Sequence, residues 1–284
     1  NNSFSRLGVS ESLSSPDCLH PSNPEYFQEL RYRTRGLLEP AIYRRVYEEA
    51  SSAQGDAIEV GTAFGSATIA IAKGLPKSFR VHSIDKISGG TAGSLGNTVV
   101  ATAKIRKNFR SFGVDKTIDF YPGSSDEVAA SILGGRKKFG LLMLDADGAI
   151  DRDFRLFYNS LTLNSPVIID DYGPGPAVVR PKANRLLRID QKKRLAALLV
   201  ELFEEKGLIQ RRGVLKETYF GFKPFDGVCD FNEINDRIFS IYRELVFSDG
   251  KKVSRIYMNV QRNFRRNAPK TYQRIKYILG RGLP

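Results

Sequence analysis

Three aspartates that follow two apolar segments are the residues best suited to do chemistry in this sequence. Asp145 follows "LLML", and Asp170 and Asp171 follow "VII". If the two segments are neighbouring parallel strands, their carboxyl ends lie about 5 Å apart and the carboxylates converge. Converging carboxylates repel one another unless a cation lies between them. Oxygen ligands without His or Cys favour Mg²⁺. Such an ion would bind a hydroxyl group of a substrate and lower the pKa of that hydroxyl.

A second interpretation of these aspartates is structural, because Asp at the end of a strand often caps the turn or helix that follows. On this interpretation Asp145 contacts only cofactor or acceptor, and Asp171 caps a loop. Asp151 and Asp153 are interpreted as residues at a helix start, where they complement the helix dipole.

A glycine-containing turn, "IEVGTAFGS" at residues 58–66, is the second candidate site. Gly61 and Gly65 are spaced G-x-x-x-G, and Thr62 and Ala63 stand where a dinucleotide fingerprint has further glycine. The sequence G-K-[ST] of a phosphate-binding loop is also absent. The turn therefore favours a nucleoside without phosphates over a dinucleotide, and a nicotinamide oxidoreductase is the least favoured function.

Two further segment ends support a nucleoside. The second apolar segment ends at Asp85, about 20 residues after the glycine turn, where a carboxylate can accept hydrogen bonds from both ribose hydroxyls. The third ends in "YPGSSDE", which places Ser124 or Ser125 within reach of the adenine.

These residues must be positioned by alternating strands and helices. Strands are expected at 56–60, 79–85, 117–123, 140–145 and 165–170, with a final pair at 208–215 and 217–223. Helices are expected at 39–51, 67–73, 99–112, 126–133, 153–161, 184–206 and 230–247. Apolar strands separated by helices indicate a parallel sheet covered on both faces. The expected fold is α/β: a Rossmann-like, doubly wound, mostly parallel seven-stranded sheet.

The segment "EVGTAFGS" resembles the first motif of class I S-adenosylmethionine-dependent methyltransferases. From about Leu37 to Pro224 the chain resembles small-molecule O-methyltransferases, above all the bacterial branch of macrocin-type sugar methyltransferases and cephalosporin-hydroxylase-like proteins. Its "DADG" and "VIIDDY" match the ends of the fourth and fifth strands in that branch.

This resemblance implies methyl transfer to a hydroxyl of a sugar or other small molecule, assisted by a divalent metal such as Mg²⁺. It implies metal ligands at Asp145, Asp170 and Asp171. The implied cofactor-binding residues are Glu59, Gly61, Thr62, Phe64, Gly65, Ser66, Asp85, Gly123, Ser124, Ser125 and Asp145.

One position departs from the family pattern, because the histidine that often serves as general base falls on Gly148. The two histidines of the chain are unsuited to replace it, since His20 lies in a loose N-terminal arm and His82 inside the second strand. A different acceptor, or a protein that binds the cofactor without turnover, is therefore an alternative.

The candidate catalytic residues are Asp145, Asp147 and Lys182, and a metal-bound water is a further candidate base. Lys182 belongs to a Gly/Pro-rich segment that is expected to act as a lid. Its second interpretation is a solvated charge on that lid.

Positive charge is concentrated at the C-terminus, where residues 251–284 hold ten Lys or Arg and no Asp or Glu, against a net charge of +13 for the chain. We expect an N-terminal arm at 1–36, an S-adenosylmethionine-binding domain at 37–225 and a basic helical extension at 226–284. Three interpretations of the extension are a helical appendage packed on the domain or on a second subunit, a contact with an anionic membrane surface, and a contact with RNA or another polyanion.

The charge makes an RNA methyltransferase an alternative, although most basic residues lie outside the cofactor domain and no "NPPY"-like motif is present. Cys18 and Cys229 fit neither a disulfide framework nor a zinc site, and no apolar run approaches 20 residues. A cytoplasmic protein is therefore expected, with peripheral attachment to the inner membrane face as an alternative.

Overall fold

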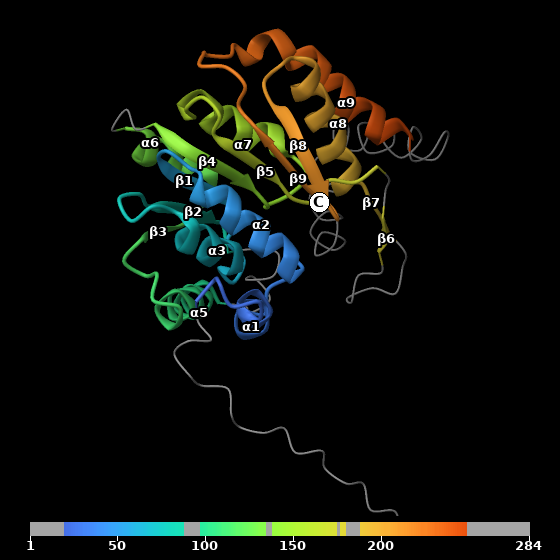
Figure 1. Cartoon of the computed structure of the whole chain (residues 1–284). Helices are drawn as coiled ribbons and strands as arrows, with labels where there is room; N and C mark the ends of the chain where they lie inside the picture. The colour runs from blue at the N-terminus through green and yellow to red at the C-terminus, as the bar shows by residue number, and fades with distance from the viewer. Residues whose placement is uncertain (1–19, 88–96, 135–137, 175–176, 180–187, 249–284) are drawn as a thin grey trace, which may run out of the picture. The chain divides into compact units, whose positions relative to one another are not determined.

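The computed structural model describes residues 20–87, 97–134, 138–174, 177–179 and 188–248 (Figure 1). The chain divides into two compact units, and the boundary lies between Cys229 and Asp230. The first unit contains the sheet and the residues that the sequence singles out for function.

A seven-stranded sheet forms the centre of the first unit, with the strand order β3-β2-β1-β4-β5-β9-β8. Strands β1 to β5 pair in parallel, whereas β9 is antiparallel to both β5 and β8. The strands are β1 (Asp56–Val60), β2 (Val81–Asp85), β3 (Ile118–Pro122), β4 (Phe139–Leu144), β5 (Pro166–Ile169), β8 (Gln210–Leu215) and β9 (Thr218–Phe222). The mostly parallel seven-stranded sheet predicted from the sequence is confirmed.

Helices cover both faces of this sheet, which explains why β4 and β5 are apolar throughout (Figure 1). One face carries α1 (Tyr26–Thr34), α2 (Pro40–Ser51), α3 (Ser66–Gly74) and α5 (Thr98–Ser111), and the other carries α6 (Ser125–Leu133), α7 (Ile150–Phe157) and α8 (Lys192–Glu205). A short 3-10 helix, η2 (Tyr158–Ser160), follows α7. Every residue of β4 is buried, as expected for a strand between two helical layers.

Local sequence fixes where several of these helices begin. Pro40 stands in the first turn of α2, where its missing N–H costs no hydrogen bond. The side chain of Asn97 accepts a hydrogen bond from the Val99 N–H at 2.8 Å and so caps α5. Ser124 and Glu127 form a reciprocal capping box at the start of α6.

The core begins earlier in the chain than the expected boundary between residues 36 and 37. Helix α1 lies inside the segment expected to be an arm, yet Tyr26, Phe27 and Leu30 are buried members of the main apolar cluster. The arm was predicted from Ser, Asn and Pro near the N-terminus, and that composition does not extend to α1. The described part of the chain therefore includes one more core helix than predicted.

The helix expected at 184–206 is shorter than predicted. Helix α8 begins at Lys192, and Arg188–Asp190 form strand β7, which pairs antiparallel with β6 (Ala177–Val179). The sequence before Lys192 suits a helix, but pairing with the nearby strand β6 prevails over local preference. The segment expected as a lid thus contributes a strand, and its Lys182 lies outside the described residues.

The second unit begins with η3 (Phe231–Ile234) and continues as α9 (Asn235–Ser248), so the helix expected at 230–247 is confirmed. The side chain of Asp230 accepts a hydrogen bond from the Asn232 N–H at 2.9 Å at the start of η3. The basic segment 251–284 and the N-terminal residues 1–19 lie outside the described residues. Within the described ranges, no helix combines the length and the apolar character needed to span a membrane.

Candidate active site

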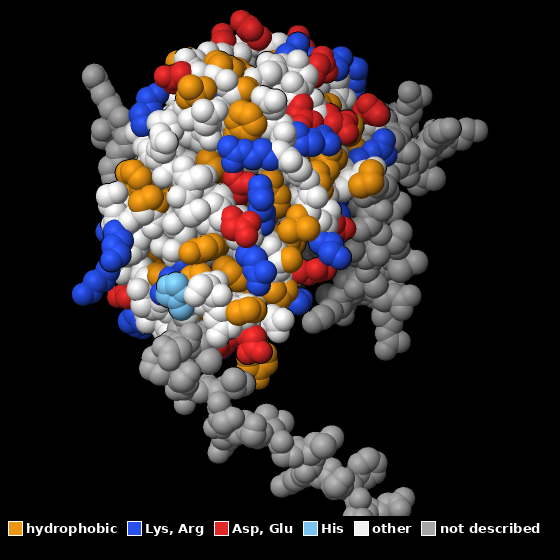
Figure 2. Space-filling view, in the orientation of Figure 1, with side chains coloured by type: hydrophobic (Ala, Val, Ile, Leu, Met, Phe, Trp, Pro, Cys, Tyr) orange, Lys and Arg blue, Asp and Glu red, His pale blue; other side chains and the backbone are white. Residues whose placement is uncertain are grey.

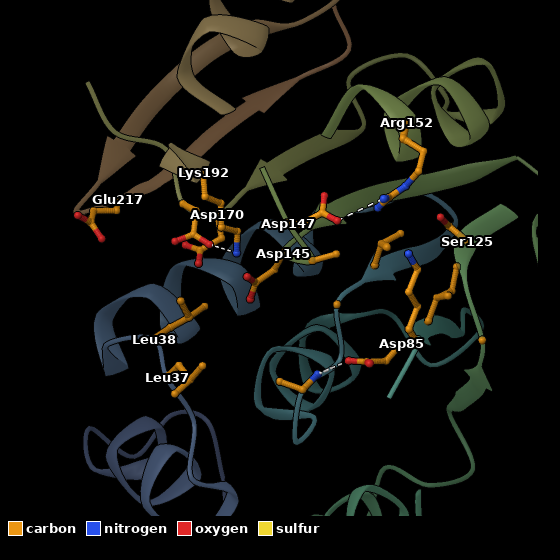
Figure 3. A pocket seen from close by; sticks show the side chains of 18 residues that line it. Leu37, Leu38, Asp85, Ser125, Asp145, Asp147, Arg152, Asp170, Lys192 and Glu217 are labelled. Carbon is orange, nitrogen blue, oxygen red and sulfur yellow. Dashed lines mark hydrogen bonds and ion pairs between the residues drawn. The ribbon is translucent and has the colours of Figure 1, made fainter. Parts of the chain in front are cut away.

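A cavity of about 550 Å³ opens at the carboxyl ends of the parallel strands, where ligands bind in folds of this kind (Figure 3). Its residues come from the ends of β1, β2, β4 and β5, from the β3–α6 junction, from α7, from the turn between β8 and β9, from the segment before α2 and from the start of α8. They are Leu37, Leu38, Val60, Gly61, Ala63, Ile84, Asp85, Lys86, Gly123, Ser125, Asp145, Ala146, Asp147, Arg152, Asp170, Asp171, Lys192 and Glu217. The predicted aspartates and the glycine turn thus line one cavity.

Gly61 brings the turn after β1 against the end of β4. Its φ of +104° is rarely adopted by other residues, and a Cβ there would lie 2.1 Å from the backbone oxygen of Asp145. The Asp145 N–H donates to the Val60 carbonyl at 2.8 Å, which ties the two strand ends together. Glycine is therefore required at position 61 by backbone conformation and by space.

Asp85 closes the same turn from β2. One carboxylate oxygen, Oδ2, accepts a hydrogen bond from the Ala63 N–H at 2.8 Å, and Oδ1 accepts one from the Ile87 N–H at 2.7 Å. A carboxylate has about four acceptor positions, so further positions on Asp85 stay available for a ligand in the cavity.

Glu59 lies beneath the turn and is not among the residues that line the cavity. It is fully buried, and its Oε2 accepts hydrogen bonds from the hydroxyls of Thr68, at 2.5 Å, and Ser83, at 2.7 Å. The other oxygen, Oε1, has no hydrogen-bond partner among the described residues. Burial raises the pKa of Glu59 to about 7, and the nearby charge of Asp85 adds to the shift. Glu59 thus positions α3 and β2 from behind.

Five other predicted cofactor residues also lie outside the cavity lining: Thr62, Phe64, Gly65, Ser66 and Ser124. The Thr62 hydroxyl pairs with that of Ser83 at 2.6 Å, and the Ser66 hydroxyl pairs with that of Thr34 at 2.6 Å. The Phe64 carbonyl accepts a hydrogen bond from the Asn108 amide at 2.8 Å. These contacts hold the glycine turn in place through residues that do not line the cavity.

Gly65 has a φ of +88°, and the ring of Phe109 fills the space that a side chain at position 65 would need. The backbone N–H of Ser124 donates to Glu127 at 2.9 Å, within the capping box of α6. Both residues shape the cavity without reaching its surface.

Ser125 lines the cavity, but its hydroxyl donates to Asp153, a buried residue of α7. Arg152 also binds Asp153, with nitrogen–oxygen distances of 3.0 and 2.7 Å, and it reaches Asp147 at 3.2 Å. This network fixes the start of α6 against the start of α7. Asp147 is therefore ion-paired, and its carboxylate is half-exposed beside Arg152 rather than directed at the acidic cluster (Figure 3).

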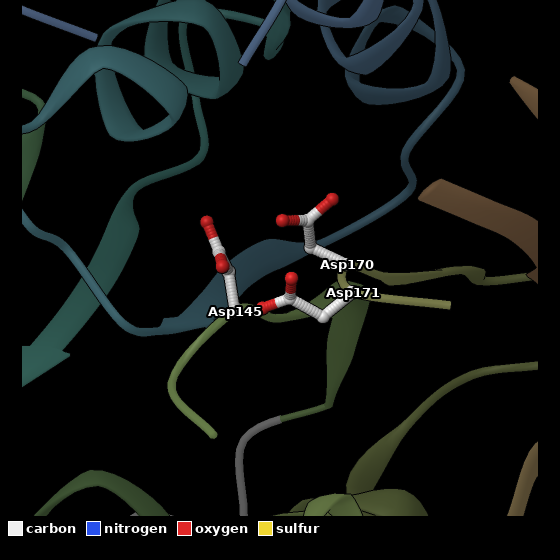
Figure 4. Close-up of side chains that lie close together, drawn as sticks. All are labelled: Asp145, Asp170 and Asp171. Carbon is white, nitrogen blue, oxygen red and sulfur yellow. The ribbon is translucent and has the colours of Figure 1, made fainter. Parts of the chain in front are cut away.

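Asp145, Asp170 and Asp171 converge, as the sequence predicts, and we call them the acidic cluster (Figure 4). Each offers a carboxylate oxygen that lies within 4.8 Å of the others. Asp170 accepts a hydrogen bond from the Thr218 hydroxyl at 2.6 Å, and Asp171 adopts a left-handed φ of +56°. Asp tolerates this conformation better than most residues. The cluster is therefore held from β4, from the end of β5 and from β9.

Burial raises the pKa of Asp145 well above its ordinary value, and the charge of Asp170 raises it further. Burial likewise raises the pKa of Asp170, with the charge of Asp171 adding to the shift despite the hydrogen bond from Thr218. Both carboxylates thus bind protons more tightly than an exposed Asp.

Lys192, the first residue of α8, forms an ion pair with Asp171 (Figure 3). Burial lowers the pKa of Lys192, but the charges of Asp171, Asp145 and Asp170 outweigh that effect and the net shift is upward. The three carboxylates have the donor chemistry of a Mg²⁺ site. The arrangement does not fit a divalent ion, however, because an ammonium group already pairs with one of the three predicted ligands.

Gly148 lies against the backbone of Lys192. A Cβ at position 148 would be 2.5 Å from the Lys192 carbonyl oxygen and 2.9 Å from its Cα. No histidine replaces the missing family base at the cavity: His82 is buried and its ring lies between Asp56 and Tyr121, away from the residues that line the cavity.

Sequence reasoning missed four charged residues on the cavity surface: Lys86, Arg152, Lys192 and Glu217. The last three each lie in a segment rich in charge, so no local signal separated them from solvent-exposed neighbours. Leu37 and Leu38 were also missed, because the segment before α2 has no motif that marks it as part of a site.

Comparison with known proteins supports the assignment of the fold. Residues 58–172 match the model of a methyltransferase domain. A comparison with curated protein sequences finds no match. The O-methyltransferase TomG from Streptomyces achromogenes, solved with SAM and involved in tomaymycin synthesis, is similar at 13% identity and a TM-score of 0.51, over 72% of this chain and 91% of that chain.

Two further solved structures are similar over comparable lengths. The O-methyltransferase from Bacillus cereus, solved with SAH, has 15% identity and a TM-score of 0.50, over 75% of this chain and 91% of that chain. The SAH-bound methyltransferase PaMTH1 from Podospora anserina has 13% identity and a TM-score of 0.50, over 74% of this chain and 89% of that chain. At these identities the similarity concerns the fold. Residues 58–172 therefore match a methyltransferase domain, and the chain has the fold of these solved methyltransferases.

Proposed function

We propose that the chain transfers the methyl group of S-adenosylmethionine to a hydroxyl of a small polyhydroxylated molecule such as a sugar. One observation carries this proposal: a single cavity joins the glycine turn and Asp85 to the acidic cluster, with Asp145 between them (Figure 3). A cofactor site and a proton-accepting site therefore adjoin.

The half of the cavity around Asp85 is suited to the cofactor. Asp85 would accept hydrogen bonds from ribose, and the bare backbone at Gly61 admits the amino-acid end. Gly123 and Ser125 line the same half and would flank the adenine. Because the hydroxyl of Ser125 is engaged by Asp153, contact with the adenine would use its backbone and Cβ.

The other half of the cavity is suited to activate a hydroxyl group. S-adenosylmethionine supplies an electrophilic methyl group on a positively charged sulfur. Transfer breaks the sulfur–carbon bond and forms a carbon–oxygen bond, and the hydroxyl proton must pass to a base. We assign that role to Asp145, which lies between the two halves and is not held by an arginine as Asp147 is (Figure 3). Asp170, fixed by Thr218, would orient the acceptor.

The lining of the acceptor half favours a polyhydroxylated molecule over a catechol. Carboxylates of the acidic cluster and Glu217, together with Lys192, offer hydrogen-bond acceptors and donors, whereas Leu37 and Leu38 supply the apolar surface. Among the described residues that line the cavity, none is aromatic. A flat aromatic acceptor would therefore lack a stacking partner there, and hydroxyl groups would find several.

An RNA acceptor is less compatible with this cavity, because its carboxylates would repel phosphate groups. The face shown in Figure 2 carries Lys and Arg interspersed with Asp and Glu rather than a continuous basic surface. Mg²⁺, which the sequence predicts at the acidic cluster, is not part of the proposed reaction because Lys192 pairs with Asp171.

Calorimetric titration with S-adenosylhomocysteine and with NADH tests the cofactor half. We expect binding of the first and no heat from the second. Asp85→Ala should weaken binding about 100-fold or more, since two hydrogen bonds to a charged group are lost. Asp115→Ala, on an exposed turn, is the matched control.

Transfer of a labelled methyl group to a panel of sugars and catechols tests the acceptor half. Methylated sugars are the expected product. Binding of S-adenosylhomocysteine without transfer to any hydroxylated acceptor would refute the proposed reaction, and binding of NADH alone would refute the cofactor.

A further inference from the structure

Lys192 enters the acidic cluster from an element that is remote in the sequence. It is the first residue of α8, it lines the cavity, and its ammonium group forms an ion pair with Asp171. Its neighbour Lys193 points elsewhere and pairs with Glu217 at 2.5 Å. Two adjacent lysines therefore differ in their surroundings, and only Lys192 contacts the cluster.

Gly148 is the residue that makes room for Lys192. A side chain at position 148 would overlap the Lys192 backbone, with its Cβ 2.5 Å from the carbonyl oxygen and 3.1 Å from the carbonyl carbon. The backbone of Gly148 does not require glycine for its own conformation, since its φ is not in the left-handed region. Glycine is required at position 148 only because the start of α8 lies so close to it.

We propose that Lys192 is the resident counter-ion of the acidic cluster, admitted by Gly148, and that it takes the place of a divalent metal ion. Only the catalytic consequence of this inference rests on the proposed function, and the metal-binding test described below does not depend on it. It makes Lys192 a functional residue, and the acidic cluster then works without the metal ion that the sequence predicts.

The charges of the site agree with this assignment. Three carboxylates and one ammonium group leave two negative charges, which attract the positively charged sulfur of the cofactor. If a divalent ion bound beside Lys192, its two positive charges would cancel that net negative charge. The ion would also be repelled by the ammonium group that pairs with Asp171.

An ammonium group also has the chemistry that the position needs. Its positive charge lies against carboxylates that repel one another, so it holds them together, a task that a metal ion would otherwise perform there.

Titration of the full-length protein with Mg²⁺ and with Mn²⁺, by calorimetry and by electron paramagnetic resonance, tests this inference. The wild-type protein should show no saturable binding below the millimolar range. Lys192→Met keeps the length of the side chain and removes its charge, so it should bind either ion at least about tenfold more tightly than wild type. Lys193→Met is the matched control and should behave as wild type does.

Gly148→Ala provides a second variant that keeps the ammonium group. Its Cβ would push the start of α8 away from the cluster, so metal affinity should rise in the same direction as in Lys192→Met. Circular dichroism would establish that both variants are folded. Micromolar binding of Mg²⁺ to wild type, with equal affinity in Lys192→Met, would overturn the inference.

Methyl transfer provides the catalytic readout. Wild-type transfer should be insensitive to EDTA, and Lys192→Met should lose most of its kcat and recover part of it when Mg²⁺ is added. Loss of wild-type transfer on addition of EDTA would refute the metal-free assignment. Because metal binding is measured without turnover and cofactor binding is measured with S-adenosylhomocysteine, a failure of this inference and a failure of the proposed function give different results.

Discussion

The wild-type protein should lose stability as pH rises from 4.5 to about 7, and Glu59→Gln should abolish this loss. The carboxyl group of Glu59 has a pKa of about 7 in the folded chain, against an ordinary value of 4.5, and burial is the main cause. The folded state therefore binds this proton more tightly than the unfolded state does. The contribution of Glu59 to stability is fully present below pH 4.5, and it is lost as pH rises to about 7.

The magnitude follows from the size of the shift. A difference of 4.5 to about 7 corresponds to about 3 kcal/mol of unfolding free energy, at about 1.4 kcal/mol for each pH unit. Glutamine can accept the hydrogen bonds from Thr68 and Ser83, but it places an amide where Oε1 has no partner among the described residues. That unsatisfied amide costs about 1–3 kcal/mol at every pH. The variant should therefore start less stable than wild type and gain on it by about 3 kcal/mol as pH rises.

Urea unfolding at a series of pH values between 5 and 8 measures this gain. Far-ultraviolet circular dichroism is the suitable probe because the chain has no tryptophan. Glu127→Gln is a control with no expected pH dependence in this range: hydrogen bonds from Ser124 lower the pKa of Glu127, so its contribution to stability is fully present above pH 4.5 and is lost only at lower pH. A difference between Glu59→Gln and wild type that stays constant from pH 5 to pH 8 would refute the reasoning.

Three further predictions concern the cavity. Gly61→Ala should cost about 2–4 kcal/mol of unfolding free energy, because φ is +104° and the Cβ would meet the backbone of Asp145. Gly113 has a φ of +64° but lies in open space, so Gly113→Ala should cost only about 1–2 kcal/mol. Urea unfolding of the two variants measures the difference. Asp145→Asn should lower the rate of methyl transfer about 100-fold or more while S-adenosylhomocysteine still binds, and retention of the full rate would exclude Asp145 as the base. Thr218→Val should lower the transfer rate about tenfold by freeing Asp170, and Thr218→Ser should restore it; equal rates in both variants would show that the hydroxyl has no role.

The strands could be predicted because the physics that forms them is local. All seven expected strands lie within a few residues of the observed ones. Strands covered on both faces need near-continuous apolar sequence, as in β4 and β5, whereas the edge strand β8 is largely exposed. The convergence of Asp145 with Asp170 and Asp171 followed from the same reasoning, since parallel strands end at one edge of the sheet. The prediction needed only the strand ends and their direction.

The remaining features depend on contacts between segments that are far apart in the sequence. Lys192 contacts Asp171 because α8 returns to the sheet after the β6–β7 pair, and nothing within the charged sequence around Lys192 indicates that return. Glu59 matches the acidic position of a cofactor motif, yet it is sealed behind the turn by contacts with Thr68 and Ser83. A motif identifies a residue type at a position, and burial then decides whether the residue touches the ligand.

Two glycines set the geometry of the cavity through backbone contacts with other elements. Gly61 fixes the end of β1 against Asp145, which places the carboxylate beside the cofactor turn. Gly148 lets the start of α8 approach, which places Lys192 beside Asp171. The sheet thus determines where the negative charges lie, and α8 determines which cation they meet. A side chain at position 148 would overlap the backbone of Lys192, so the approach of α8 and the position of the ammonium group both depend on this one backbone contact.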